Sequence, residues 1–439
     1  PVLLYELPGL LRGHDFQGTA IVASGRVIDF VGGAAEPPCL AAAFDVGTTT
    51  LVGELLDLRT GAIRGFASRM NPQTVFGDDV LSRITHASRG PEALREVHNT
   101  VVSALNDMLA EMSGRAGVTV KSIYEVAVSG NTTMEHLFAG LNPNALGLVP
   151  FVPVARRGLT LEPVRTGVAM NPRGRVYVLP VIGGFVGGDT VAGIAATGLG
   201  EAERPALLID IGTNGELALI HNGRLSATSC AAGPAFEGAR ISCGMRAAAG
   251  AIEAVDLGDD VQATTIGGVP PIGLCGSGLI DLVAELLRKG MLQSQGLFVA
   301  RDALPGSLAP ALRDRVVEHA EGTAFVLARA DETRSGRPLL LTQRDVRELQ
   351  LATGAIRAGI SILLKRASLE PAQLDRVHVA GGFGNYIRLV NAQRIGLLPE
   401  ALREDQFSFV GNTSLEGARA AALSLGAFEG RVAHKAELV

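Results

Sequence analysis

Residues 40–50 read Leu40-Ala-Ala-Ala-Phe-Asp45-Val-Gly47-Thr48-Thr49-Thr50, an apolar strand that ends in an aspartate, a glycine and a run of hydroxyls. The same plan returns at Ala206-Leu-Leu-Ile-Asp210-Ile-Gly212-Thr213-Asn214-Gly215-Glu216. Two further strand-like stretches follow each copy. In the second copy they are joined by Asn222-Gly223, a pair typical of a tight hairpin turn. Each copy therefore predicts a three-stranded meander whose first hairpin carries the polar residues.

The polar residues of these hairpins suit an anion. Glycine lets backbone N–H groups approach an oxyanion without a side chain in the way, and threonine hydroxyls add donors. A carboxylate beside phosphates would repel them unless it holds a hydrated Mg2+ that bridges the phosphate oxygens. A single Asp-x-Gly turn is common, but two copies in matching contexts, 210 − 45 = 165 residues apart, predict a phosphate-binding pair. We therefore assign Asp45 and Asp210 to the metal.

Composition sets the class of protein. At 439 residues the chain is long enough for about two or three domains. With 47% hydrophobic and 19% charged residues it is globular rather than disordered. The net charge of −5, without a basic stripe, argues against nucleic acid as a partner. The longest apolar stretch, near residues 176–186, is interrupted by Pro180 and falls short of the roughly 20 residues of a membrane span.

The four cysteines are widely spaced and include no Cys-x-x-Cys pair, which disfavours a disulfide scaffold or a zinc site. No signal-peptide pattern is present, so we expect a cytoplasmic protein in a reducing compartment. The sequence opens on Pro1 rather than methionine, and we expect that something precedes it.

The two hairpins stand in a repeated order of elements. In the first half, predicted helices at 77–88 and 91–113 precede a strand at 125–128, a strand at 176–182 and a helix at 189–200. In the second half, a predicted helix at 342–365 precedes strands at 376–380 and 407–410 and a helix at 415–425. This duplication predicts two α/β subdomains, residues 39–200 and 201–439, that face each other across a cleft with one hairpin from each side.

Two stretches fall outside the repeat. Residues 1–38 end in Pro37-Pro38 and are predicted to be a small remnant of a preceding domain. Residues 292–337 contain Pro305 and Pro310 among mixed charges and are predicted to be an insertion in the second half, to which the sequence assigns no role.

These features resemble the superfamily of acetate and sugar kinases, heat-shock chaperones and actin (ASKHA). The resemblance implies two ribonuclease H-like (actin-like) subdomains around a nucleotide cleft that binds ATP with Mg2+. It assigns both hairpins to the phosphates and the late Gly-Gly-Phe-Gly turn to the nucleoside. By position, the residues so assigned are Gly47, Thr48, Thr49, Thr50, Gly212, Thr213, Asn214 and Gly215 for the phosphates, and Gly381, Gly382, Phe383 and Gly384 for the nucleoside.

A narrower resemblance is to the ATP-dependent reductive activators of corrinoid proteins. Eight motifs carry it: Asp45-Val-Gly-Thr-Thr-Thr50, Ser68-Arg-Met-Asn71-Pro-Gln, Gly77-Asp-Asp-Val-Leu-Ser-Arg83-Ile, Ser129-Gly-Asn131-Thr-Thr-Met134, Gly187-Gly-Asp189, Asp210-Ile-Gly-Thr-Asn-Gly-Glu216, Cys230-Ala-Ala-Gly-Pro-Ala-Phe-Glu237-Gly and Gly276-Ser-Gly278-Leu-Ile-Asp281. The resemblance implies an ATPase that drives reduction of a Co(II) corrinoid to Co(I) on a methyl-transferring partner, and it implies a homodimer.

In that family the electron passes through a ferredoxin-like domain, commonly 2Fe-2S and N-terminal. This sequence departs from the pattern because it has no plant-type Cys-x4-Cys-x2-Cys run. We therefore expect the ATPase portion, with residues 1–38 left from the middle or linker domain and electrons supplied by an iron-sulfur domain outside the sequence. Cys230, Cys243 and Cys275 are either buried free cysteines or cluster ligands like those of the related dehydratase activators.

Several residues keep two interpretations. Asp189 either caps a helix or positions metal or water. Glu216 either orients the attacking water or is an exposed hairpin glutamate. Gly276 and Ser277 either offer N–H groups to an anion or cap the helix that follows. We assign all four to the site, Asp189 and Glu216 with Asp45 and Asp210 as catalytic. A metabolite kinase and a slowly hydrolysing regulatory module stay open as alternative functions.

Overall fold

The structure is a computed structural model of the 439-residue chain, and it describes residues 2–23, 25–320, 322–382, 387–432 and 437–438. The chain forms two compact units. Unit 1 comprises Pro1–Ala196 and Thr413–Lys435, and unit 2 comprises Thr197–Asn412 and Ala436–Val439. The chain therefore leaves unit 1 after residue 196, builds most of unit 2, returns to unit 1 at residue 413 and ends in unit 2.

Unit 1 is built on a six-stranded sheet of order β5-β4-β3-β6-β8-β7. Its first three strands form the predicted antiparallel meander, whereas β6 and β8 run parallel to β3. The strands are β3 (Leu40–Val46), β4 (Thr50–Asp57), β5 (Ile63–Met70), β6 (Ile123–Gly130), β7 (Leu159–Leu161) and β8 (Arg175–Val178). Every residue of β3 except Asp45 is buried, so both faces of the sheet are covered at its centre.

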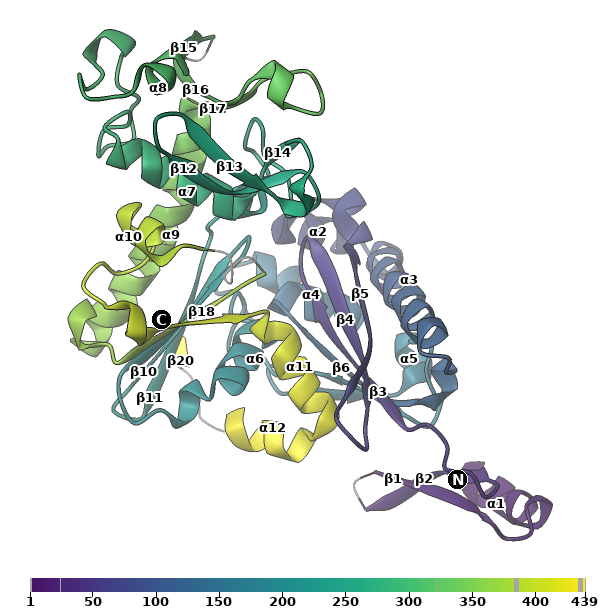
Figure 1. Cartoon of the computed structure of the whole chain (residues 1–439). Helices are drawn as coiled ribbons and strands as arrows, with labels where there is room; N and C mark the ends of the chain where they lie inside the picture. Colours follow the sequence, from purple (N-terminus) through teal and green to yellow (C-terminus); the bar gives the residue numbers. More distant parts are fainter. Residues whose placement is uncertain (1, 24, 321, 383–386, 433–436, 439) are drawn as a thin grey trace. The chain divides into compact units, whose positions relative to one another are not determined.

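Helices cover the sheet of unit 1 (Figure 1). Helix α3 packs against β4 and β5, and α11 packs against β3 and β6. The helices of unit 1 are α1 (Val2–Gly13), α2 (Val80–Ala87), α3 (Pro91–Arg115), α4 (Thr132–Phe138), α5 (Pro163–Thr166), α6 (Gly188–Thr197), α11 (Thr413–Leu423) and α12 (Leu425–Val432). A separate hairpin, β1 (Gly18–Ala23) with β2 (Arg26–Gly32), follows α1.

Unit 2 repeats the plan. Its sheet has the order β19-β18-β9-β10-β11-β20, in which β9, β10 and β11 form an antiparallel meander and β18 and β19 run parallel to β9. The strands are β9 (Ala206–Ile211), β10 (Gly215–His221), β11 (Arg224–Cys230), β18 (Arg376–Ala380), β19 (Phe407–Gly411) and β20 (Glu437–Leu438). Five strands of each sheet share one order, so the predicted duplication and the ribonuclease H-like fold are confirmed.

The rest of unit 2, in its described residues, adds two small sheets and four α-helices. One sheet joins β12 (Ala251–Leu257), β13 (Val261–Thr265) and β14 (Gly273–Leu274), and the other joins β15 (Val316–His319), β16 (Gly322–Ala328) and β17 (Leu339–Thr342). The helices are α7 (Gly276–Arg288), α8 (Pro310–Asp314), α9 (Gln343–Ala367) and α10 (Leu389–Arg394).

The predicted insertion, residues 292–337, is folded into unit 2. It contains α8, β15 and β16, and its leucines at 304, 308 and 312 join the apolar core of that unit. The guanidinium of Arg315, which is only 2% exposed, donates to the Asp260 carboxylate near the turn between β12 and β13 at 2.5 Å. The insertion is thus held by both apolar packing and a charged contact.

At both ends of the chain, the two compact units are divided differently from the predicted domains, which run over residues 1–38, 39–200 and 201–439. Residues 413–435 belong to unit 1, because α11 covers β3 and β6 there. Residues 2–32 also belong to unit 1, where buried Asp29 accepts hydrogen bonds from the Tyr124 hydroxyl at 2.9 Å and the Asn171 amide at 3.2 Å. The predicted domain boundaries stay a prediction.

No helix in the described part of the chain combines the length and apolar character that crossing a bilayer requires.

Candidate functional site

The first hairpin, residues 45–50, lies where β3 gives way to β4. Asp45 pairs in register with Ser129 of the parallel strand β6, so both side chains stand at the carboxyl ends of their strands. The Gly47 N–H donates to the Thr50 carbonyl at 3.0 Å and closes the turn. A Cβ at Gly47 would lie 2.6 Å from that carbonyl oxygen, so only glycine fits without a shift.

Three carbonyls of the first hairpin accept hydrogen bonds from Asn71 and Arg83. The Asn71 amide donates to the Gly47 oxygen at 2.8 Å, Arg83 donates to the Thr48 oxygen at 2.6 Å, and the Asn71 N–H donates to the Thr49 oxygen at 2.9 Å. In a planar trans peptide the N–H is directed opposite to the carbonyl. These three peptides therefore turn their N–H edges away from Asn71 and Arg83, which is the orientation that anion binding requires.

Two more side chains fix this hairpin. The Asn131 amide donates to the Thr48 hydroxyl oxygen at 2.9 Å. The Ser414 hydroxyl, at the start of α11, donates to the Asp45 carboxylate at 2.8 Å and is itself hydrogen-bonded to Ser129 at 2.9 Å. The chain thus returns to unit 1, where Ser414 donates a hydrogen bond to Asp45, the predicted metal ligand.

Unit 1 also contains an acidic cluster of Asp45, Asp189 and Glu135. Burial raises the pKa of Asp189 to about 6, and the nearby Asp45 adds to the rise. Burial and the proximity of Asp189 raise the pKa of Glu135 well above its usual value. Asp189 is the second residue of α6, and its carboxylate accepts from the adjacent Thr190 N–H at 2.6 Å. It is therefore not the N-cap residue of that helix.

The second hairpin, residues 210–216, has a similar build in unit 2. Asp210 on β9 pairs in register with Glu216 on β10, and the Gly212 N–H donates to the Asn214 carbonyl at 3.1 Å. Glu216 is 8% exposed and accepts from the Ser229 hydroxyl at 3.3 Å, so it is not the exposed glutamate of the alternative interpretation.

The segment after β11 folds over this second hairpin. The Gly233 N–H donates to the Thr213 carbonyl at 2.8 Å, and the Thr213 hydroxyl donates to the Glu237 carboxylate at 2.5 Å. Sequence reasoning assigned Thr213 to phosphate and gave Glu237 no role. The carboxylate on the Thr213 hydroxyl has no signal in sequence spacing, because 24 residues separate the two.

The late glycine turn begins beside Asp210, since Ala380 at the end of β18 pairs with it in register. Gly381 has a φ of +114°, and a Cβ there would lie 2.3 Å from the Ile211 carbonyl oxygen, so the position favours glycine. Gly382 follows on the surface. Phe383 and Gly384 lie outside the described residues.

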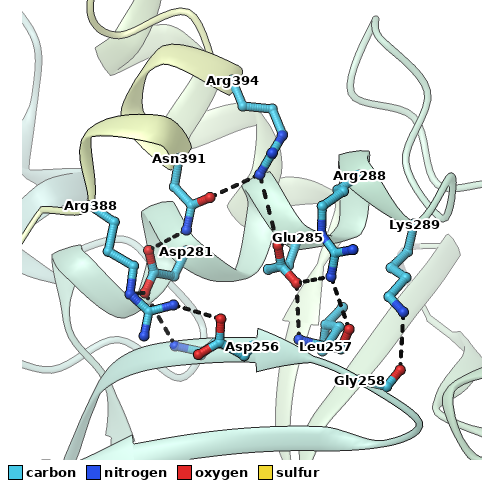
Figure 2. Close-up of polar contacts among 11 residues, drawn as sticks. Asp256, Leu257, Gly258, Asp281, Glu285, Arg288, Lys289, Arg388, Asn391 and Arg394 are labelled. Atoms are coloured by element: carbon cyan, nitrogen blue, oxygen red, sulfur yellow. Dashed lines mark hydrogen bonds and ion pairs between the residues drawn. The ribbon is translucent and has the colours of Figure 1, made fainter. Parts of the chain in front are cut away.

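A pocket of about 700 Å³ follows this turn in unit 2 and is lined mainly by residues of α10 and its flanks. Figure 2 shows the ion pairs at its wall. Arg388 donates to Asp256 at 2.7 Å and lies 3.3 Å from Asp281, and the Asn391 amide donates to Asp281 at 2.7 Å. Arg394 lies 3.8 Å from Glu285 of α7. The pocket is therefore polar on the side where α7 and α10 meet.

Helix α7 opens at Gly276 without a side-chain cap. A Cβ at Gly276 would lie 1.9 Å from the Phe236 carbonyl oxygen, so the backbones are in close contact. The Ser277 hydroxyl donates to the Glu253 carbonyl at 2.8 Å and is buried. Any contact of these residues with an anion would therefore use backbone N–H groups.

The cysteines do not form a metal site in the described residues, which contain no group of three or more His, Cys, Asp and Glu side chains suited to an ion. Burial raises the pKa of the Cys230 thiol, with Glu216 adding to the rise, and burial raises the pKa of Cys243 to about 12. All four cysteines are free. Within the described part of this chain the cysteines therefore form no group of three or more ligands of the kind an iron-sulfur cluster needs.

Comparison with known proteins identifies the family of the chain. Family models described as the RACo middle region and as the C-terminal, ASKHA domain of RACo match residues 40–202 and 204–435. The corrinoid activation enzyme RamQ of Eubacterium limosum is 38% identical over 90% of this chain and 66% of its own length. The [Co(II) methylated amine-specific corrinoid protein] reductase of Methanosarcina barkeri is 26% identical over 86% of this chain and 68% of its own length.

A solved structure of a reductive activator for corrinoid,iron-sulfur protein agrees with a TM-score of 0.90 and 38% identity, and the match covers all of this chain and 70% of that one. The chain therefore spans about two thirds of the length of these relatives. The ASKHA domain model covers more than half of the chain, and the two hairpins and the repeated sheet order agree with it. On this evidence, the chain belongs to the RACo family.

Proposed function

We propose that this chain is the ATP-binding and ATP-hydrolysing part of a reductive activator that returns a corrinoid protein from Co(II) to Co(I). The observation that carries the proposal is the pair of glycine-threonine hairpins with a carboxylate at each strand end, in a member of the RACo family. The relatives named above act on corrinoid proteins, and this supports a corrinoid protein as the partner.

In this proposal ATP is bound through residues of both hairpins. The outward N–H edges of the first hairpin and the hydroxyls of Thr48, Thr49 and Thr50 receive phosphate oxygens. Gly212, Thr213, Asn214 and Gly215 do the same from the second hairpin. Thr213 then exchanges Glu237 for a phosphate oxygen, so nucleotide binding would loosen the segment that covers the second hairpin.

The acidic residues suit Mg2+. The nearby Asp45 helps to raise the pKa of Asp189, and a divalent cation between carboxylate and phosphate relieves such repulsion. Asp45 and Asp210 would hold the ion, which neutralises charge on the phosphate chain when bound. The few protein ligands are in keeping with an ion that retains most of its waters.

The nucleoside end is proposed to lie at the late glycine turn and the pocket that follows it. Gly382, where a Cβ would meet nothing within 4 Å, leaves the backbone open to a flat ring beside the packed Gly381, and the pocket wall supplies Arg388 and Asn391. Gly276 and Ser277 would contribute backbone N–H groups.

Hydrolysis needs a base for water. Asp189 has a pKa of about 6, close to neutral pH, which suits a group that takes a proton from water as the water attacks the γ-phosphorus and ADP leaves. Glu216 would orient that water from unit 2 through its carboxylate.

The electron is proposed to come from an iron-sulfur domain outside this sequence, since the described cysteines do not fit a cluster. One electron converts Co(II) to Co(I), and ATP supplies the driving force. A cytoplasmic homodimer remains part of the proposal.

The test is a reconstitution. The protein, a Co(II) corrinoid protein and a low-potential donor are mixed with ATP, with a non-hydrolysable ATP analogue or without nucleotide, and Co(I) is followed by visible absorbance. ATP-dependent formation of Co(I) supports the proposal. Equal Co(I) with and without nucleotide, or the phosphorylation of a small acceptor instead, would favour the kinase alternative or a purely regulatory role.

A further inference from the structure

Arg83 of α2 is fully buried beneath the first hairpin, and it is the largest of the completely buried side chains in the described residues. Its guanidinium contacts neutral groups only. It donates to the Thr48 carbonyl at 2.6 Å and to the Gly77 carbonyl at 3.0 Å. Weaker contacts reach the Met134 sulfur at 3.2 Å and the Gln73 side-chain oxygen at 3.5 Å.

The positive charge of Arg83 has no direct counter-charge. Within the described ranges no ion pair joins Arg83 to a carboxylate. Asp78 and Asp79 raise the pKa of Arg83 by their charge without forming an ion pair with it. Asp79 instead caps α2, where its carboxylate accepts from the Ser82 N–H at 2.8 Å. Burial lowers the pKa of Arg83 to about 10, so the group is still charged at neutral pH.

A buried charge with only neutral partners is unfavourable unless something offsets it. Carbonyl dipoles offset part of the charge here. The Thr48–Thr49 peptide, whose oxygen Arg83 holds, presents its N–H edge on the far side. An anion there would meet a peptide dipole that is already polarised by the guanidinium behind it.

We propose that Arg83 is a positioning residue for phosphate: it fixes the Thr48–Thr49 peptide with the N–H edge outward, and its buried positive charge favours a phosphate chain on the far side of the first hairpin. The inference rests on the proposed ATP function, and it adds a residue that does not itself touch the ligand. Asn71 and Asn131 hold the same hairpin with neutral amides, so the charge is the contribution specific to Arg83.

The proposal predicts that a change at Arg83 alters the affinity for ligands that carry phosphates and not for those without. Affinities for ATP, ADP and adenosine are measured by calorimetry for the wild type, Arg83→Met and Arg83→Lys, all with Mg2+. Arg95→Met is the matched control, because Arg95 is exposed and donates only within its own helix, to the Pro91 carbonyl at 3.3 Å. It removes one positive charge without touching the hairpin.

We expect Arg83→Met to weaken ATP and ADP about tenfold or more, the effect of losing a charge-assisted hydrogen bond. Adenosine affinity should change less than about twofold, the control should bind like the wild type, and Arg83→Lys should recover part of the loss for ATP. Equal losses for ATP and adenosine would overturn the proposal in favour of a purely structural role, as would unchanged ATP affinity.

If Arg83→Met does not fold, Arg83→Gln decides, since it removes the charge but keeps an amide donor for the Thr48 carbonyl. A selective loss of phosphate-bearing ligands supports the proposal. A loss shared equally with adenosine, or no loss for ATP, contradicts it. Failure of the wild type to bind ATP is a separate result that refutes the proposed function itself.

Discussion

At the scale of single residues, Asp189 is a group whose pKa is set by its surroundings. Burial and Asp45 bring its pKa to about 6. We predict that Asp189→Asn lowers ATP turnover about 100-fold or more, the usual contribution of a general base, while ATP affinity is kept or rises because a repulsive charge is removed. Steady-state hydrolysis and calorimetric binding together check this. Unchanged turnover would remove Asp189 from the mechanism.

The pKa of Asp189 also predicts how ATP turnover depends on pH. A base must be deprotonated to act, so wild-type turnover per bound ATP should rise with pH through about 6 and then level off. A pH series of maximal rates, with stability monitored at each pH, checks this. A profile that is flat between pH 5 and 8 would contradict the assignment.

The raised pKa of Glu135 predicts how the stability of the protein depends on pH. Its pKa is raised in the folded protein, so between its ordinary value and the raised value the folded state binds the proton more tightly than the unfolded state. Stability therefore falls as pH rises through that window. We predict that wild type loses stability relative to Glu135→Gln between pH 5 and 8, measured by urea unfolding. Parallel pH curves for the two proteins would refute this.

At the scale of elements, helix α11 is the connection that the sequence order does not reveal. It follows β19 of unit 2's sheet but packs on β3 and β6 of unit 1, where it places Ser414 on Asp45. Gly417 allows this packing, because a Cβ there would lie 2.4 Å from Ala192 of α6. The close approach leaves no room for a methyl group.

We predict that Gly417→Ala lowers the free energy of unfolding by about 1–3 kcal/mol, the usual effect of overpacking. Gly426→Ala in α12 is the matched control, since a Cβ at that position meets nothing within 4 Å, and alanine there should be neutral or slightly stabilising. Urea unfolding of both variants is the measurement. A Gly417→Ala protein as stable as the control would show that the contact relaxes easily.

These elements also mark what sequence could and could not provide. Asp45, Asp210 and the glycine turn at 381–382 were predictable, because each stands at the end of an apolar strand and the pattern repeats. The contacts of Asn71, Arg83 and Ser414 with the first hairpin were not, although two of them lie in recognised motifs. Such contacts depend on how distant segments fold together, which local periodicity does not encode.

At the scale of the whole molecule, duplication explains the architecture. Two sheets of the same strand order each bring a hairpin with a carboxylate to their strand ends. The chain crosses between the units near residues 196 and 412, so each unit is completed by a segment distant in sequence.

The most direct test of the central claim is ATP hydrolysis by this chain, alone and with a Co(II) corrinoid protein, in wild type and Asp210→Ala. The account predicts slow hydrolysis that the corrinoid protein stimulates severalfold, and loss of this stimulated rate in Asp210→Ala with the fold intact by circular dichroism. A rate that is indifferent to the corrinoid protein, or stimulation that persists without the Asp210 carboxylate, would contradict it.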